Sequence, residues 1–187
     1  MSSHRERMLS GARYRPDDPD LVASRRACQR RLAVFNASPV DDERRHRLLC
    51  ELFGSFGAGS DVLPRFQCDY GEHIHLGANC FVNYDAVMLD CAPITIGDNA
   101  AIGPRAQLLT ALHPIDDHHA RRAGWETAAP ITIGHNVWLG AGVIVCPGVT
   151  IGDDSVVGAG SVVTRDVPAQ VLAVGNPCRV SRVIGSP

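Results

Sequence analysis

The sequence predicts a mainly β protein: a parallel β-helix built from six-residue repeats, with an α-helical cap before it and one loop extruded from its coils. Three observations carry this prediction. Aliphatic residues recur every six positions in the second half of the chain, glycine often follows them, and the first sixty residues show a helical spacing instead. We therefore divide the chain into a helical cap, residues 1–60, and a β-helix with a C-terminal tail, residues 61–187.

The six-residue ladder predicts the shape of one coil. A period of six fits a short flat strand plus a tight turn, and three such sides close a coil of about 18 residues. One aliphatic side chain per side then points inward, so stacked coils bury the ladder continuously. The repeat leaves the hand of the coil open, because no helices pack between the strands. The ladder comprises Leu76, Val82 and Met88, then, in shifted register, Ile96, Ile102 and Leu108, and finally Ile133, Leu139, Val145, Ile151, Val157 and Val163.

The cap contains two stretches with helical spacing. The first runs from residue 18 to about 36, with an N-cap aspartate followed by a proline. The second runs from residue 41 or 42 to 53 and ends at a glycine. We expect the arginine pairs of this region to be solvated helix surface, with room for one arginine to face a ligand; they stand at 25–26, 30–31 and 44–45.

The ladder is interrupted once. The hexad that begins at Leu108 ends at His113, and the repeat resumes only at Ile133. The residues between, about 114–130, therefore form an extruded loop with the sequence "PIDDHHARRAGWETAAP". A single histidine in a loop is usually solvated surface, but an imidazole can accept a hydroxyl proton near neutral pH because its unperturbed pKa is about 6.5.

Composition excludes several classes of protein. The formal net charge of −2 gives no electrostatic argument for a nucleic-acid or membrane partner. No run approaches the roughly 20 apolar residues of a membrane span, and the N-terminus has no apolar signal segment. Seven cysteines without a CxxC pair predict reduced thiols, so we expect a cytoplasmic protein without a metal site.

The repeat and its flanks resemble a known family. "IGHNVWLGAGVIVCPGVTIGDDSVVGAGSVVTRDVP" resembles the left-handed β-helix of hexapeptide-repeat acyltransferases. "RFQCDYGEHIHLG", "CFVNYDAVMLD", "HPID" and "AVGNPCRVSRVI", with the helical "MLSGARY" segment, are similar to the maltose and galactoside acetyltransferase group of sugar O-acetyltransferases. The resemblance implies a left-handed β-helix, direct acetyl transfer from acetyl-CoA to a sugar hydroxyl, and a homotrimer whose sites use two chains.

The resemblance also implies site residues. His113 matches the general base, and Asn83 matches the polar residue that orients the acceptor hydroxyl. The positions that match the acceptor site are Asp17, Arg25, Asp69, Tyr70, Asn83, Asp90 and Cys91. Those that match the coenzyme A site are Trp138, Ala141 and Ala159 for the pantetheine arm, with Thr164, Arg165, Arg179 and Arg182 for the phosphates, which guanidinium groups bind well.

The acceptor positions depart from the galactoside type. Galactoside-type members have paired acids where this chain has Asp90 and Cys91. Pro16 falls where an aspartate would align, although Asp17 could substitute after a small shift. The sequence therefore predicts the transfer chemistry and leaves the sugar, its hydroxyl and the biological role open.

Three other interpretations remain at this stage. His113 and His118 form an H-x4-H pair like that of gamma-class carbonic anhydrases, with His75 upstream, but these residues could share a metal only across a subunit interface. A β-helix can also be a non-catalytic assembly module. A covalent route through Cys91 or Cys146 is a mechanistic variant of acetyl transfer.

Overall fold

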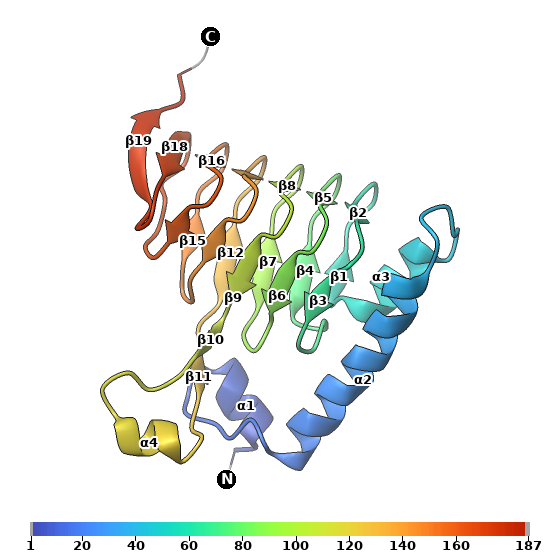
Figure 1. Ribbon diagram of the computed structural model, residues 1–187, viewed down its shortest axis with the longest axis vertical. Helices are drawn as coiled ribbons and strands as arrows, with labels where there is room; N and C mark the ends of the chain where they lie inside the picture. The colour runs from blue at the N-terminus through green and yellow to red at the C-terminus, as the bar shows by residue number, and fades with distance from the viewer. Residues whose placement is uncertain (1, 186–187) are drawn as a thin grey trace.

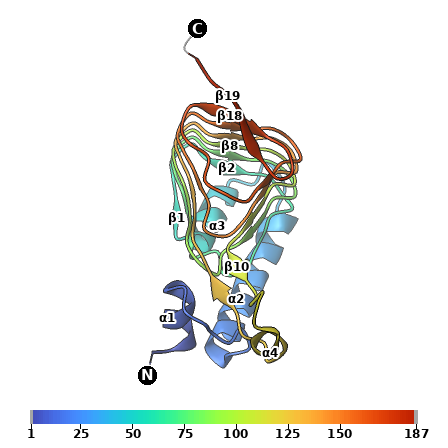
Figure 2. The same cartoon turned by 90° about the vertical axis from the view of Figure 1, so that its left-hand side faces the viewer.

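The computed structural model describes residues 2–185 and shows a β-helix of about six turns with helices at its N-terminal end (Figure 1). α1 (His4–Leu9), near the start of the described chain, and β19 (Arg179–Val183), near its end, lie far apart across the molecule (Figures 1 and 2). Within these described residues, no helix is both long enough and apolar enough to cross a membrane.

Three walls of short parallel strands form the β-helix (Figure 2). The first wall contains β1 (Ser55–Phe56), β4 (Ile74–Leu76), β7 (Ile94–Ile96), β12 (Ile131–Ile133) and β15 (Thr150–Ile151). The second contains β2 (Asp61–Val62), β5 (Phe81–Val82), β8 (Ala101–Ile102), β13 (Trp138–Leu139), β16 (Val156–Val157) and β18 (Val171–Val174), with β19 (Arg179–Val183) antiparallel at its edge. The third contains β3 (Gln67–Cys68), β6 (Val87–Leu89), β9 (Gln107–Leu109), β14 (Ile144–Val145) and β17 (Val162–Val163).

The ladder residues form the core, as the period predicts. All twelve are at most 3% exposed. Ile94 pairs with Ile131, so the extruded loop interrupts one coil without breaking the register of the wall. Burial of this continuous aliphatic column supplies the main stabilisation, about 25 cal/mol per Å² of apolar surface removed from water.

The early coils are longer than the later ones. Ser55 pairs with His75 and His75 with Thr95, an advance of 20 residues, whereas Thr132 pairs with Thr150, an advance of 18. The two additional residues lie at the corner between the third and first walls. They explain why the ladder restarts in shifted register at Ile96.

The cap contains α1 (His4–Leu9), α2 (Pro19–Ala37) and α3 (Arg45–Leu52). The prediction for the first long helix is confirmed, but α3 begins later than residue 41 or 42. The Asp42 carboxylate accepts a hydrogen bond from the backbone N–H of Arg44, which forms a turn before the helix. The β-helix also begins before residue 61, because β1 already pairs with β4.

Arg45 corrects the expectation that the arginine pairs are all solvated. Its side chain is buried, and its guanidinium lies 4.4 Å from the ring centroid of Phe35. It donates hydrogen bonds to the carbonyl oxygen of Val62 and to the hydroxyl of Ser38, each at 2.9 Å. Arg45 thus connects the cap to the first coil.

The extruded loop is a hairpin that carries a short helix. β10 (Ala111–Leu112) pairs antiparallel with β11 (Thr127–Ala128), and α4 (His118–Arg122) lies between them. The segment after α1 contacts this hairpin: Arg13 pairs with Asp117 at 3.1 Å, and Tyr14 forms a β-bridge with Glu126. The N-terminal segment and the loop therefore form one unit beside the coils (Figures 1 and 2).

Candidate functional site

The candidate residues lie on two edges of the β-helix. The histidine edge is the corner between the third and first walls and comprises the turns at 69–73, 90–93 and 110–113. The alanine edge is the corner between the second and third walls and comprises the turns at 64–65, 83–85, 104–105, 141–142 and 159–160. His113 lies on the first edge and Asn83 on the second, so one chain does not bring them together.

The histidine edge holds a partly buried polar cluster. Arg25 of α2 donates to the hydroxyl of Tyr70 at 2.7 Å and to the carbonyl of Pro16 at 2.5 Å. The thiol of Cys91 donates to the carboxylate of Asp69 at 3.4 Å. Burial raises the pKa of Asp69, against the opposing effects of the Cys91 thiol and the Arg25 charge. The structure thus brings together Arg25, Asp69, Tyr70 and Cys91, and their contact with an acceptor stays a prediction.

Asp90 supports the turns of the histidine edge through its buried carboxylate. Its side chain is fully buried, and its carboxylate oxygens accept from the backbone N–H groups of Asp69, Tyr70 and His73 at 3.0, 2.8 and 3.3 Å. Burial nevertheless raises its pKa. The carboxylate satisfies the amides of the longer turn, because a buried donor without a partner would cost about 1–3 kcal/mol. A contact between Asp90 and an acceptor stays a prediction, and the structure shows this carboxylate engaged by backbone amides.

Asp17 is exposed at the rim of this cluster. Its carboxylate pairs with Arg15 at 2.7 Å, and this hydrogen bond holds its pKa below the usual range. The neighbouring Pro16 carbonyl is the group that contacts Arg25. The short segment between α1 and α2 therefore follows the histidine edge.

His113 lies at the base of the extruded hairpin, directly after β10. Its side chain is 62% exposed, and its Nε2 atom is 3.9 Å from Oε1 of Glu126. Sequence reasoning missed Glu126. One signal could have found it, because Glu126 is the only acidic residue between Asp117 and Asp153.

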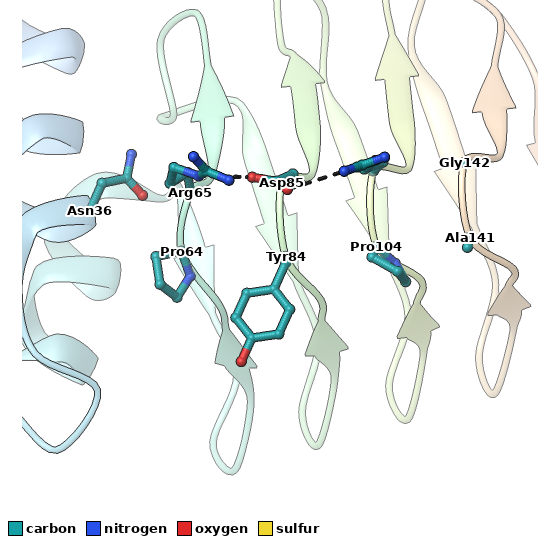
Figure 3. A pocket seen from close by; sticks show the side chains of 9 residues that line it. Asn36, Pro64, Arg65, Tyr84, Asp85, Pro104, Ala141 and Gly142 are labelled. Atoms are coloured by element: carbon teal, nitrogen blue, oxygen red, sulfur yellow. Dashed lines mark hydrogen bonds and ion pairs between the residues drawn. The ribbon is translucent and has the colours of Figure 1, made fainter.

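The alanine edge contains a groove of about 770 Å³ (Figure 3). Asn83 precedes the turn that contributes Tyr84 and Asp85, and its amide oxygen accepts from the N–H of Tyr84 at 2.7 Å, which leaves the NH2 group as a donor. The groove is lined by Asn36, Pro64, Arg65, Tyr84, Asp85, Pro104, Arg105, Ala141 and Gly142.

Glycine keeps two turns of the alanine edge bare. The second position of the last four turns has positive φ: 60° at Asp85 and at Arg105, 67° at Gly142 and 70° at Gly160. A Cβ added to either glycine would meet nothing within 4 Å. Glycine is favoured where a chain adopts this conformation and where a ligand approaches the backbone. The bare turns include Ala141 and Ala159, the positions that match the pantetheine site.

The other positions that match the coenzyme A site lie in two separate places, the second wall and the histidine edge. Trp138 is 57% exposed on β13 in the second wall, and Arg179 and Arg182 lie exposed on β19 beside that wall. Thr164 and Arg165 follow β17 and are exposed at the continuation of the histidine edge. One chain therefore does not gather these residues into one site.

His75, His113 and His118, the candidate metal ligands of the carbonic-anhydrase-like alternative, do not lie together as a metal site within one chain. His75 lies on β4 with its Nδ1 atom 3.3 Å from the hydroxyl of Ser55, and the rings of His118 and His119 have centroids 4.1 Å apart. In the part of the chain that the structure describes, no three His, Cys, Asp or Glu side chains are placed to hold a metal ion.

Two family models match the chain. Residues 7–57 match the maltose acetyltransferase hexapeptide capping motif, and residues 130–165 match the bacterial transferase hexapeptide, six repeats. Together with the coils and the polar edge, these matches define a hexapeptide-repeat transferase with a left-handed β-helix, as the resemblance implied.

Whole-chain comparisons narrow the family. The galactoside O-acetyltransferase of Escherichia coli is 46% identical over 80% of this chain and 74% of that protein. A crystal structure of a maltose O-acetyltransferase from Clostridium difficile has a TM-score of 0.96 at 47% identity and covers 99% of both chains. A hexapeptide-repeat acetyltransferase from Vibrio cholerae, crystallised with acetyl-CoA, has a TM-score of 0.91 at 40% identity and covers 99% of this chain and 100% of that one. The chain belongs to the maltose and galactoside acetyltransferase group of hexapeptide-repeat acetyltransferases.

Proposed function

We propose that this protein transfers the acetyl group of acetyl-CoA to a hydroxyl of a sugar or a similar acceptor, with His113 as the general base. The observation that supports this most is the position of His113, whose exposed imidazole shares an edge with the Arg25, Asp69 and Tyr70 cluster. A polyhydroxylated acceptor fits such a cluster, because carboxylate and guanidinium groups bind hydroxyls by charge-assisted hydrogen bonds.

The chemical step is a direct transfer. Neutral His113 accepts the proton of the acceptor hydroxyl while its oxygen attacks the thioester carbonyl. A carbon–oxygen bond forms, the carbon–sulfur bond breaks, and the coenzyme A thiolate takes the proton from the imidazolium. The NH2 group of Asn83 is suited to donate to the developing oxyanion or to orient the acceptor.

A covalent acyl-cysteine route is disfavoured at Cys91. Burial raises the pKa of this thiol, and the nearby Asp69 carboxylate acts in the same direction. Thiolate is the nucleophilic form of cysteine, so such a thiol is a poor nucleophile at neutral pH. We therefore favour direct transfer over an acyl intermediate on Cys91.

The complete site requires two chains. Because His113 and Asn83 lie on different edges, we infer that the histidine edge of one chain meets the alanine edge of the next. Closed threefold symmetry would repeat this contact in a homotrimer. Phe81 and Trp138, 40% and 57% exposed on the second wall, would be covered by such a contact.

The same contact would complete the coenzyme A site. The bare turns at 141–142 and 159–160 have room for the pantetheine arm, and Arg179 and Arg182 would meet the phosphates. Thr164 and Arg165 would come from the adjoining chain. A cytoplasmic location suits the seven free thiols.

His113→Ala tests the proposal, with His118→Ala as a matched control in the same loop. Purified variants are incubated with acetyl-CoA and a panel containing maltose, galactosides and amino sugars, and the release of thiol is measured. We expect kcat to fall about 10²- to 10⁴-fold for His113→Ala, the usual contribution of a general base, and less than tenfold for His118→Ala. Full activity of His113→Ala on the best acceptor would disprove the assignment.

A further inference from the structure

Glu126 faces His113 across the base of the extruded hairpin. Leu112 of β10 pairs with Thr127 of β11, so the next antiparallel pair is His113 with Glu126. Oε1 of Glu126 is 3.9 Å from Nε2 of His113. The carboxylate side chain is 17% exposed, against 62% for the imidazole, so Glu126 is the more sheltered member of the pair.

Tyr14 fixes this carboxylate. The backbone N–H of each residue donates to the carbonyl of the other, at 2.9 and 3.1 Å, and the hydroxyl of Tyr14 donates to Oε2 of Glu126 at 2.8 Å. Tyr14 is fully buried, and burial raises its pKa, so the hydroxyl keeps its proton and remains a donor. With Oε2 engaged by Tyr14, Oε1 is the oxygen that faces the imidazole.

We propose that Glu126 is a positioning residue for His113. It holds one ring nitrogen, so that the other faces the acceptor hydroxyl, and its negative charge stabilises the imidazolium that forms when His113 takes the proton. The inference rests on the proposed function, because it takes His113 to be the base. A separation of 3.9 Å is within ion-pair range, and catalytic contacts often shorten when substrate binds.

The other titratable neighbours of Glu126 do not provide a negative charge to stabilise the His113 imidazolium. Tyr14 and Cys91 are the titratable groups whose pKa its carboxylate raises, and both stay protonated at neutral pH because they are buried. Asp69 lies behind the Cys91 thiol. Glu126 is therefore the carboxylate placed to compensate a positive charge on His113.

Glu126→Gln tests the role with little change of shape, because the amide oxygen can still accept from Tyr14. With acetyl-CoA and maltose, or the best acceptor of the panel, we expect kcat to fall about tenfold or more and the KM for acetyl-CoA to change less than twofold. Asp116→Asn, a charge removal in the same loop, is the matched control and should change kcat less than twofold. Unchanged kcat in Glu126→Gln would overturn the inference.

A double variant separates positioning from general structural damage. If Glu126 acts through His113, adding Glu126→Gln to His113→Ala should lower the residual rate less than twofold further, because residues that act as a unit are not additive. Multiplied losses would overturn the inference while leaving His113 as the base. Full activity of His113→Ala alone would instead remove the proposed function itself.

Chemical rescue provides an independent measurement. Formate added to Glu126→Ala should raise kcat by several-fold with saturation, and it should not rescue His113→Ala. Glu126→Asp, which keeps the charge, should retain more activity than Glu126→Ala. Rescue of both alanine variants, or of neither, would contradict a role for the carboxylate beside His113.

Discussion

The histidine edge and the alanine edge belong to the same coils but are built differently. The histidine edge is irregular: its early turns have two additional residues, it carries the extruded hairpin, and Asp69, Tyr70 and Asp90 are buried or partly buried there. The alanine edge is regular: its turns stack one above another, the earlier ones carrying the exposed side chains of Arg65, Tyr84 and Arg105. The later turns expose alanines and two glycines with open space around them. The two edges therefore differ mainly in the length and regularity of their turns.

We propose that the contrast reflects what the two substrates of the proposed reaction require. A sugar is recognised by side-chain donors and acceptors, which need turns long enough to carry them and partners to hold them. A flexible pantetheine arm needs a smooth surface, which an unmodified repeat already offers. Under the proposed function, interruption of the repeat would therefore build the acceptor side, and continuation of the repeat would build the cofactor side.

The strongest test of the two-edge arrangement is complementation between inactive variants. His113→Ala and Asn83→Ala, each expected to lose about 100-fold or more in kcat, should recover about a quarter of the wild-type activity when refolded together, because a quarter of the sites then join two intact edges. Thiol release by the mixed trimers is the measurement.

A pair of variants on one edge serves as the control for that experiment. His113→Ala mixed with Glu126→Gln should gain nothing beyond the average of the two, since every site receives one damaged histidine edge. Equal recovery in both mixtures, or an active monomer by light scattering, would rule out a site shared between chains.

The alanine edge is tested by filling its groove. Gly142→Asn keeps a residue that tolerates positive φ but adds a side chain where the cofactor would lie. We expect the KM for acetyl-CoA to rise about tenfold, equivalent to about 1.4 kcal/mol, with the KM for the acceptor nearly unchanged. Gly124→Asn, at φ 76° near the end of the extruded helix, is the control and should change neither constant more than twofold.

The smallest expected effect concerns the stability of the histidine edge. Burial raises the pKa of Asp69, so the folded protein holds this proton more tightly than the unfolded chain and loses stability as pH rises through the folded-state pKa. Asp69→Asn should therefore raise Tm at pH 7 by about 2–4 °C, and this gain should disappear below about pH 4.

The activity of Asp69→Asn tests whether the carboxylate that lowers stability contributes to acceptor binding. The KM of Asp69→Asn for the acceptor should rise about tenfold, since hydrogen bonds to charged groups contribute about 1.5–3 kcal/mol. Asp17→Asn is the contrasting control, because Arg15 lowers the pKa of Asp17. Removal of the Asp17 carboxylate should therefore give no gain in Tm. A lower Tm for Asp69→Asn than for the wild type at pH 7 would contradict the expected direction of the burial effect.

Much of the fold could be predicted from the sequence. The ladder from Leu76 to Val163 predicted the buried core, and the gap between Leu108 and Ile133 predicted the loop. The shifted register at Ile96 was visible in the sequence, and the structure explains it by two additional residues in each early turn of the histidine edge. The start of α3 and the burial of Arg45 could not be predicted, because both depend on contacts with distant segments.

The site divides in the same way. The sequence by itself determined the periodic core, the position of the interruption and the residue types available there, because local spacing dictates which side chains face inward. Only the tertiary structure decided that Asp90 satisfies backbone amides, that Glu126 faces His113, and that His113 and Asn83 lie on different edges. The physical reason is that these relations depend on how coils stack and how the N-terminal segment packs on the hairpin, and Tyr14 and Glu126 are joined by contacts across 112 residues of sequence.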